Sequence, residues 1–281
     1  MSKLNGNNPL LPSIGKLVQV KDLAPEIKLF GIEMQNGGGE LFQNHKPGQF
    51  AFLSAFGTGE APFGIASTPD RGNILEFAVQ RLGSVTTALH ELSIGDHVGI
   101  RGPLGNSFPM DEFEGKDILV LGGGIGAAPL RPVIHSVIDN RKKYGKLTIL
   151  MAARHPSLHV FQDEYQTWQE TSNTSLHLTV DEPDDNWDDN VGLITDLVRK
   201  ISPSPKNSVV IICGPPVMIY YANQLLNELG FLQEQQFVTL EARMHCGIGK
   251  CGRCNIDKTL VCVDGPVFSM LEVGAFSESY L

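Results

Sequence analysis

Four of the five cysteines lie within residues 246–262, at a spacing that suits a metal centre. Cys246, Cys251, Cys254 and Cys262 form the pattern C-x4-C-x2-C-x7-C. Its first three positions match the spacing of plant-type [2Fe–2S] loops, in which four thiolates hold the cluster. A disulfide-stapled secreted domain would instead spread its cysteines through a short chain, and here residues 1–212 contain none.

Glycines inside this loop favour iron–sulfur over zinc. Gly247, Gly249 and Gly252 let the backbone wrap closely around a bulky inorganic core. They also let backbone N–H groups point at the sulfurs, often through residues with φ above zero. The alternative is a structural four-thiolate zinc site, whose cysteines usually come as two short paired arms. We therefore predict a [2Fe–2S] cluster and keep zinc as the alternative.

A second glycine-rich segment, residues 122–126, stands between an apolar run and an amphipathic helical pattern. Gly122, Gly124 and Ala127 fit the form G-x-G-x-x-G/A. Backbone that approaches closely through glycine and then starts a helix is a site for a phosphate group. The alternative is a structural turn that binds nothing.

Two more turns could border a ligand. Cys213 ends an apolar run and is followed by glycine and proline, and residue type alone favours a buried, inert thiol there. The segment from Arg81 to Thr86 places a glycine and two hydroxyls at the start of a helix. Ser84 could be the N-cap of that helix, or the segment could bind a pyrophosphate.

The elements that must position these residues change in type along the chain. Up to about residue 111, strand-like runs near residues 16–23, 26–34, 48–55 and 73–80 are separated by Gly and Pro, with one helix at residues 84–92. From Asp117 on, apolar strands alternate with helical patterns, which predicts a parallel sheet covered by helices. The helical patterns include residues 158–168 and a stripe formed by Met218, Tyr221, Leu225 and Leu229.

Composition limits the class of protein. At ~150 residues per domain, 281 residues predict about two domains, and 42% hydrophobic residues exclude a disordered chain. The formal charge of −9 disfavours nucleic acid as a partner, and no apolar run is long enough for a membrane helix. Residues 1–12 are polar and lack an apolar signal-peptide core, so we expect a cytoplasmic protein.

Taken in sequence order, these pieces resemble the ferredoxin–NADP reductase superfamily over nearly the whole chain. Within it they are most similar to iron–sulfur flavoprotein electron-transfer subunits, such as those of hydrogenase, dihydroorotate dehydrogenase and anaerobic sulfite reductase. The segments that carry the resemblance are residues 62–67, 83–86, 102–105, 122–129 and 213–215, with the cysteine loop.

The resemblance implies an N-terminal antiparallel β-barrel for FAD (residues 1–112), an α/β parallel-sheet domain for NAD(H) (113–240) and a small [2Fe–2S] segment (241–281). The FAD-binding residues would be Pro62, Phe63, Gly64, Ile65, Ala66, Ser67, Arg81, Gly83, Ser84, Val85 and Thr86. The NAD-binding residues would be Gly123, Gly124, Ile125, Gly126, Ala127, Pro129, Asp181, Cys213, Gly214, Pro215 and Met218, with Cys213 beside the nicotinamide.

Two features refine this expectation. The superfamily often has Arg and Ser where this chain has Ala61 and Gly64. Arg81 could take over the charge that neutralises the FAD pyrophosphate, and flavin N5 would then be left to backbone N–H groups or water. Acidic residues crowd positions 181–189 and would repel a 2′-phosphate, which favours NAD over NADP.

The resemblance implies chemistry carried by the cofactors, with no catalytic acid or base. No further active site follows the cluster, so we expect a catalytic or electron-accepting partner subunit. The alternatives are a free-standing NAD(P)H-dependent reductase of a soluble acceptor and, in another class, a zinc-stabilised binding module without enzymatic activity.

Overall fold

The computed structural model describes residues 8–274 and 276, which form two compact units. The barrel unit contains the residues up to Ser107 together with Glu241–Pro266. The α/β unit contains Phe108–Leu240 together with the residues from Val267 on. The division by role into residues 1–112, 113–240 and 241–281 remains a prediction.

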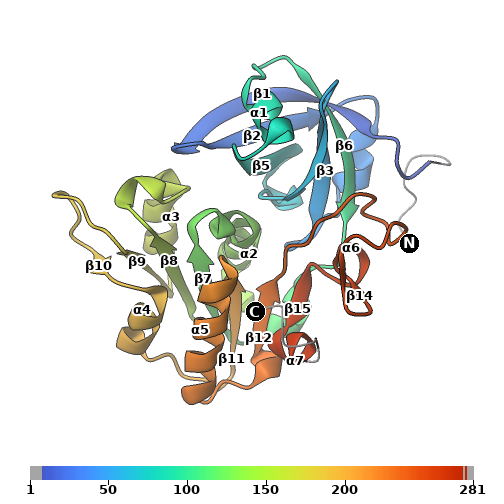
Figure 1. The fold of residues 1–281 in the computed structure, drawn as a ribbon. Coiled ribbons are helices and arrows are strands. Elements are labelled where there is room, and N and C mark those ends of the chain that lie inside the picture. Colours follow the sequence, from blue (N-terminus) through green and yellow to red (C-terminus); the bar gives the residue numbers. More distant parts are fainter. Residues whose placement is uncertain (1–7, 275, 277–281) are drawn as a thin grey trace. The chain divides into compact units, whose positions relative to one another are not determined.

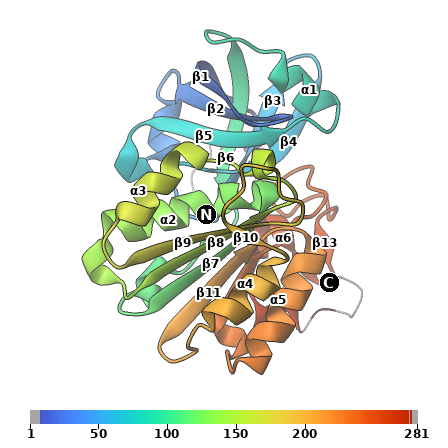
Figure 2. The ribbon, with the colours of Figure 1, turned by 90° about the vertical axis from the view of Figure 1, so that its left-hand side faces the viewer.

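The barrel unit is built on a six-stranded antiparallel sheet with strand order β4-β3-β6-β1-β2-β5 (Figure 1 and Figure 2). The N–H of Ala66, just after β4, donates to the carbonyl oxygen of Glu76 in β5, so the two ends of the sheet are joined. This arrangement confirms the predicted antiparallel β domain. The strands are β1 (Ser13–Ala24), β2 (Ile27–Met34), β3 (Phe50–Ala55), β4 (Gly59–Gly64), β5 (Ile74–Gln80) and β6 (His97–Leu104), with helix α1 (Ser84–His90).

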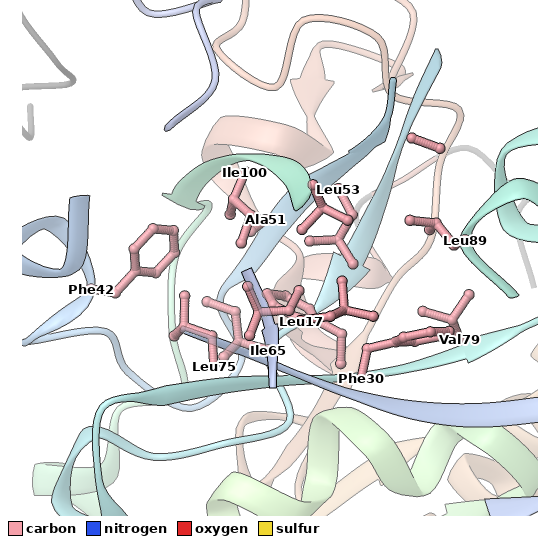
Figure 3. Close-up of a cluster of buried hydrophobic side chains, with 14 residues drawn as sticks. Leu17, Phe30, Phe42, Ala51, Leu53, Ile65, Leu75, Val79, Leu89 and Ile100 are labelled. Carbon is pink, nitrogen blue, oxygen red and sulfur yellow. The ribbon is translucent and has the colours of Figure 1, made fainter. Parts of the chain in front are cut away.

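The core of the barrel unit follows from the alternation of side chains along its strands. Figure 3 shows fourteen buried hydrophobic residues, among them Ala51 and Leu53 of β3. The side chains of Phe50 and Phe52 lie on the opposite face of β3, yet they are buried too. A strand that is buried on both faces needs a second cover besides the barrel core. The cysteine segment provides it, and its elements are β13 (Asn255–Ile256), β14 (Thr259–Leu260) and α6 (Val261–Asp264).

The α/β unit has a seven-stranded sheet of order β10-β9-β8-β7-β11-β12-β15, parallel except for β15. Figure 2 shows α2 and α3 on one face of this sheet and α4 and α5 on the other. The predicted parallel sheet covered by helices is confirmed. The strands are β7 (Asp117–Gly123), β8 (Leu147–Ala153), β9 (Thr174–Val180), β10 (Asn190–Val191), β11 (Ser208–Cys213), β12 (Gln236–Thr239) and β15 (Val267–Ser269). The helices are α2 (Ala127–Asp139), α3 (Tyr165–Glu170), α4 (Ile194–Ile201), α5 (Pro216–Glu228) and α7 (Met270–Val273).

The strand order places a topological switch between β7 and β11. From β7 the chain adds β8 and β9 on one side, and it then crosses to add β11 and β12 on the other. At such a switch the loops that follow the two strands run to opposite sides, and ligands bind between them. Gly122 of β7 is paired with Cys213 of β11 at this edge.

Two expectations about helices were wrong. Residues 158–164 are not α-helical, because Phe161 adopts φ of +60° and turns its ring into the interior. The buried stripe of α5 is also shifted, and Tyr221 is exposed beside Tyr220. The small and branched side chains of α5 face the sheet instead, and they are Ile219, Ala222, Leu225 and Leu226.

Among the described residues, no helix combines the length and the apolar character needed to cross a membrane.

Candidate functional site

The cysteine loop turns its backbone N–H groups toward sulfur. The Sγ of Cys246 accepts from the N–H groups of Ile248, Lys250 and Cys251, at 3.5, 3.2 and 3.4 Å. The Sγ of Cys262 accepts from Gly249 at 3.3 Å. Left-handed glycines make these turns, since Gly247, Gly249 and Gly252 have φ of +71°, +72° and +70°. The predicted positive φ values and N–H contacts to sulfur are confirmed.

These contacts give the thiols of Cys246 and Cys262 different pKa values. Burial alone would raise the pKa of the Cys246 thiol, but its three N–H donors outweigh burial and lower that pKa to about 7. Burial and the neighbouring Cys254 raise the pKa of the Cys262 thiol to about 12. A thiolate, the form that binds a metal, therefore forms more readily at Cys246 than at Cys262.

The thiols are neighbours in two pairs. The side chain of Cys246 interacts with that of Cys251, and the side chain of Cys262 interacts with that of Cys254. Cys254 and Cys262 are buried, whereas Cys251 is exposed. In the part of the chain that the structure describes, no three His, Cys, Asp or Glu side chains are gathered closely enough to hold one metal ion.

The glycine-rich turn lies at the switch between β7 and β11. β7 ends at Gly123, a short 3-10 turn covers Gly124–Gly126, and α2 begins at Ala127. A Cβ on Gly126 would lie 2.5 Å from the carbonyl oxygen of Cys213, so this glycine is required for the two loops to touch. The structure thereby brings together two segments that are 87 residues apart, counting from Gly126 to Cys213.

The side chain of Met218 lies over this turn. A Cβ on Gly123 would meet its Sδ at 2.5 Å, and a Cβ on Gly214 would meet its Cε at 2.5 Å. Because β7, β11 and α5 converge here, the predicted nucleotide residues of these three elements share one place in the α/β unit. Asp181 follows β9, two strands away from β7, and is exposed.

The acidic segment after β9 is solvent-exposed and carries one local ion-pair cluster. The side chain of Glu182 faces Arg154 at 3.5 Å and His155 at 3.4 Å. The N–H of Asp181 donates to the carbonyl oxygen of Ala153 at the end of β8, so this segment begins at the carboxyl edge of the sheet.

In the barrel unit, residues 62–67 run from the end of β4 into a buried turn. The ring of His45 lies 2.9 Å from the carbonyl oxygen of Ser67, which fixes the backbone there. The Oγ of Ser67 accepts from the N–H of Glu76 at 3.0 Å. This stretch is therefore held by backbone and side-chain contacts before any ligand is added.

The turn before α1 is organised by a threonine. The Oγ1 of Thr86 accepts from the N–H groups of Leu82 and Gly83, both at 2.9 Å. Ser84 is the first residue of α1 and the N-cap is Gly83, so the alternative in which Ser84 caps the helix is wrong. Arg81 pairs with Glu26, and about half of each side chain is exposed.

Sequence reasoning missed one buried arginine of the barrel unit and its acidic partner. The guanidinium of Arg101 in β6 contacts the carboxylate of Glu60 in β4 at 2.6 Å and the carbonyl oxygen of Cys246 at 3.0 Å. An available signal was a single arginine within the otherwise uncharged run that ends β6.

Comparison with known proteins places these features in a family. Residues 120–224 match the oxidoreductase NAD-binding domain, and residues 241–274 match the iron–sulfur cluster binding domain of dihydroorotate dehydrogenase B. Sulfhydrogenase 1 subunit gamma of Pyrococcus furiosus is 38% identical over 274 residues, which cover 95% of this chain and 94% of the relative. The chain belongs to this family of electron-transfer subunits.

A second relative also matches this chain over most of its length. A probable dihydroorotate dehydrogenase B electron transfer subunit of Methanocaldococcus jannaschii is 32% identical over 92% of this chain and 89% of its own length. The family resemblance expected from the sequence is thus confirmed. The match of residues 241–274 also supports an iron–sulfur domain over a zinc module.

Solved structures share the fold. A structure of NADH-dependent reduced ferredoxin-NADP oxidoreductase superposes with a TM-score of 0.76 at 25% identity, over 92% of this chain and 88% of that one. A ferredoxin NADP+ reductase from Neisseria gonorrhoeae gives 0.69 at 19% identity, over 80% of this chain and 97% of its own. This chain therefore shares the fold of NAD-binding flavoprotein reductases.

Proposed function

We propose that this chain passes electrons between NAD(H), FAD and a [2Fe–2S] cluster, and on to or from a partner subunit of a larger cytoplasmic redox complex. The observation that carries the proposal is that one chain matches both an NAD-binding oxidoreductase domain and an iron–sulfur cluster-binding domain. Relatives over nearly its full length are named as a sulfhydrogenase gamma subunit and an electron transfer subunit.

Cys246, Cys251, Cys254 and Cys262 would hold the cluster. A [2Fe–2S] core has two irons, and in a four-cysteine site each takes two thiolates. The neighbouring pairs Cys246–Cys251 and Cys254–Cys262 suit that demand. The N–H groups directed at the sulfurs would stabilise the negative charge of the thiolates.

Residues 62–67 would line the flavin ring, and Arg81 with residues 83–86 would hold the FAD pyrophosphate. The backbone at Ser67 is already fixed by His45 and Glu76, and Gly83 has open space where a side chain would stand. Since alanine occupies position 61, the positive charge for the pyrophosphate would come from Arg81, which shares its guanidinium with Glu26.

Residues 123–129 would hold the dinucleotide pyrophosphate with the N–H groups at the start of α2, and Cys213–Pro215 and Met218 would border the nicotinamide. When bound, the flavin supplies the exchange between two-electron hydride transfer and single-electron transfer. The role of this chain's residues is to orient the nicotinamide and to exclude water from it. The exposed carboxylates from Asp181 onward favour NAD, because they would repel a 2′-phosphate.

The test is anaerobic purification of the full chain. We expect flavin absorbance, about two iron atoms per chain, and faster flavin reduction by NADH than by NADPH in stopped-flow measurements. A colourless chain with a single zinc overturns the proposal, and tighter, faster reduction by NADPH overturns its nucleotide preference.

The partner is tested separately, by mass spectrometry of the chains that co-purify with this one from native extract. A stable catalytic or electron-accepting subunit is the expected result. Rapid turnover of a physiological acceptor by the isolated chain would instead identify a free-standing reductase.

A further inference from the structure

Arg101 is a buried cation in the middle of β6. Its side chain is only 1% exposed, and its Cζ lies 4.4 Å from the centre of the Phe52 ring. Its Nε and Nη2 donate to the two carboxylate oxygens of Glu60, at 3.0 and 2.6 Å. A guanidinium that has left water is tolerated only with such pairing, so this position is fixed from several sides.

The strand register explains why these residues meet. Across β3 and β6, Phe52 stands opposite Arg101, and across β3 and β4 it stands opposite Pro62. Side chains of directly paired residues lie on one face of a sheet. Phe52, Arg101 and Pro62 therefore share a face, and it is the face opposite to Leu53 and the barrel core.

The start of the cysteine loop rests on this same face. Arg101 Nη1 donates to the carbonyl oxygen of Cys246 at 3.0 Å, and its Nη2 lies 3.4 Å from that of His245. A Cβ on Gly247 would meet the Phe52 ring at 2.7 Å and Leu104 at 2.8 Å. One guanidinium thus joins β4, which runs into the predicted flavin-lining residues, to the backbone of the first cysteine.

We propose that Arg101 is a positioning residue for the iron–sulfur cluster, and that the Arg101–Glu60 pair sets the reduction potential of that cluster. The inference rests on the proposed function, because it requires a cluster at the four cysteines. Arg101 fixes the carbonyl of Cys246 and so the direction from which this ligand approaches. Its charge favours the reduced cluster, which carries one more electron, and Glu60 opposes that effect.

The two charges are not equally screened. The Arg101 side chain is 1% exposed and that of Glu60 is 32% exposed. A buried charge acts through a lower effective dielectric constant than one near water. Removing the charge of Arg101 should therefore lower the cluster potential, and removing the charge of Glu60 should raise it by a smaller amount.

Shifts of opposite sign in the cluster potential distinguish an electrostatic role of the pair from a purely structural one. Arg101→Met removes both hydrogen bonds of the pair and Glu60→Gln removes at least one of them. Loosening of the loop would therefore displace the potential in the same direction in both variants. An electrostatic role gives opposite signs. A third variant, Arg101→Lys, keeps the charge but cannot reproduce the planar contacts to Glu60 and Cys246.

The experiment measures the midpoint potential of the cluster by EPR-monitored redox titration of the full chain, with iron and flavin content on the same samples. For Arg101→Met we expect the equilibrium constant for reduction of the cluster to fall roughly tenfold. That is the effect of removing one positive charge about 10 Å from the cluster at an effective dielectric constant of about 20. Glu60→Gln should give a smaller shift the other way. Arg101→Lys should keep the potential close to that of the parent chain, with a lower iron content.

Matched controls come from an exposed ion pair in the α/β unit. Arg199 and Asp196 are each 59% exposed and lie 3.4 Å apart. Arg199→Met and Asp196→Asn make the same changes in net charge as the two test variants, and we expect neither to move the potential.

The outcomes are distinct. If Arg101→Met and Glu60→Gln shift the potential in the same direction, or leave it unchanged, the inference is overturned while the proposed function stands. If the parent chain shows no iron–sulfur signal, the proposed function itself fails. If Arg101→Met does not fold, the Glu60→Gln variant decides whether the inference stands. A cluster potential of Glu60→Gln that is no higher than that of Arg101→Lys then overturns the inference.

Discussion

The barrel unit and the α/β unit each bury one arginine in nearly the same surroundings. Arg101 stacks on Phe52 at 4.4 Å and pairs with a glutamate at 2.6 Å. Arg131 of α2 stacks on Phe161 at 4.9 Å and also pairs with a glutamate at 2.6 Å. The same side-chain chemistry is thus used once in each unit.

The two pairs differ in what else they hold. Glu164, the partner of Arg131, gives its second carboxylate oxygen to His135 at 2.6 Å, so this network ties α2 to the turn before α3. Arg101 instead reaches backbone carbonyl oxygens of the cysteine loop. A buried arginine paired with a glutamate therefore does not have one fixed role. The groups that lie beyond the pair decide whether it fastens elements or positions a ligand.

The largest effect is expected from Arg131→Met. It removes the partner of one Glu164 carboxylate oxygen in a largely buried place and leaves the contact of the other oxygen with His135. Removing one member of a buried ion pair costs about 3–5 kcal/mol. Urea unfolding should show that loss in the α/β unit, whereas Arg199→Met, at an exposed pair, should change stability by less than about 1 kcal/mol. A loss below about 1 kcal/mol for Arg131→Met would contradict a fastening role.

The pH dependence of the α/β unit should carry the signature of Glu164. Burial alone would raise the pKa of this carboxyl, but the hydrogen bonds from His135 and Arg131 outweigh it and lower the pKa from 4.5 to about 2. A carboxyl whose folded pKa is depressed stabilises the fold above its unfolded pKa. That contribution is lost as the pH falls from about 4.5 toward 2, and it amounts to about 3 kcal/mol.

Glu164→Gln tests this assignment. The variant should be less stable than the parent chain at pH 6, and the difference should shrink as the pH falls toward 2. Urea midpoints measured between those pH values give the result. A difference that stays constant with pH would show that the carboxyl charge is not what stabilises the parent chain.

The sequence predicts the elements of both units because their signals are local. Apolar alternation in β5 and the switch to strand–helix alternation at Asp117 each lie within a few residues. The left-handed glycines of the cysteine loop also follow from local demands, since N–H groups can reach a sulfur two to five residues away only through tight turns.

The Arg101 contacts could not be predicted in the same way. Arg101 and Cys246 are separated by 145 residues, and their contact depends on which face of β6 the loop covers. The same holds for Phe161, whose turn into the interior follows from the tertiary contact with Arg131 rather than from helical periodicity. Long-range packing decided both cases.

Alanine substitutions at two glycines can measure how much the cysteine loop depends on its contact with β3. Gly247 and Gly252 have almost the same positive φ, so alanine at either costs about 1 kcal/mol of backbone strain. Only at Gly247 does the new Cβ meet a neighbour, the Phe52 ring at 2.7 Å, and nothing lies within 4 Å at Gly252. Overpacking adds about 1–3 kcal/mol.

Gly247→Ala should therefore lower the unfolding free energy of the barrel unit and its iron content more than Gly252→Ala does. Urea unfolding and iron analysis of both variants give the comparison. Equal losses would mean that φ strain alone governs the loop, and that its contact with Phe52 is not needed to hold it.

The smallest effect on stability is expected at Arg81 and Glu26, a pair in which neither side chain is buried. Because about half of each side chain is in solvent, Arg81→Met should change the unfolding free energy by less than about 1 kcal/mol. If Arg81 supplies the charge for the FAD pyrophosphate, the same variant should lose flavin on dilution, and Glu26→Gln, which releases the guanidinium, should retain it more tightly. Flavin fluorescence released on dilution measures both. Unchanged retention in both variants would remove Arg81 from the flavin site and would leave the exposed pair with no measurable role in either stability or binding.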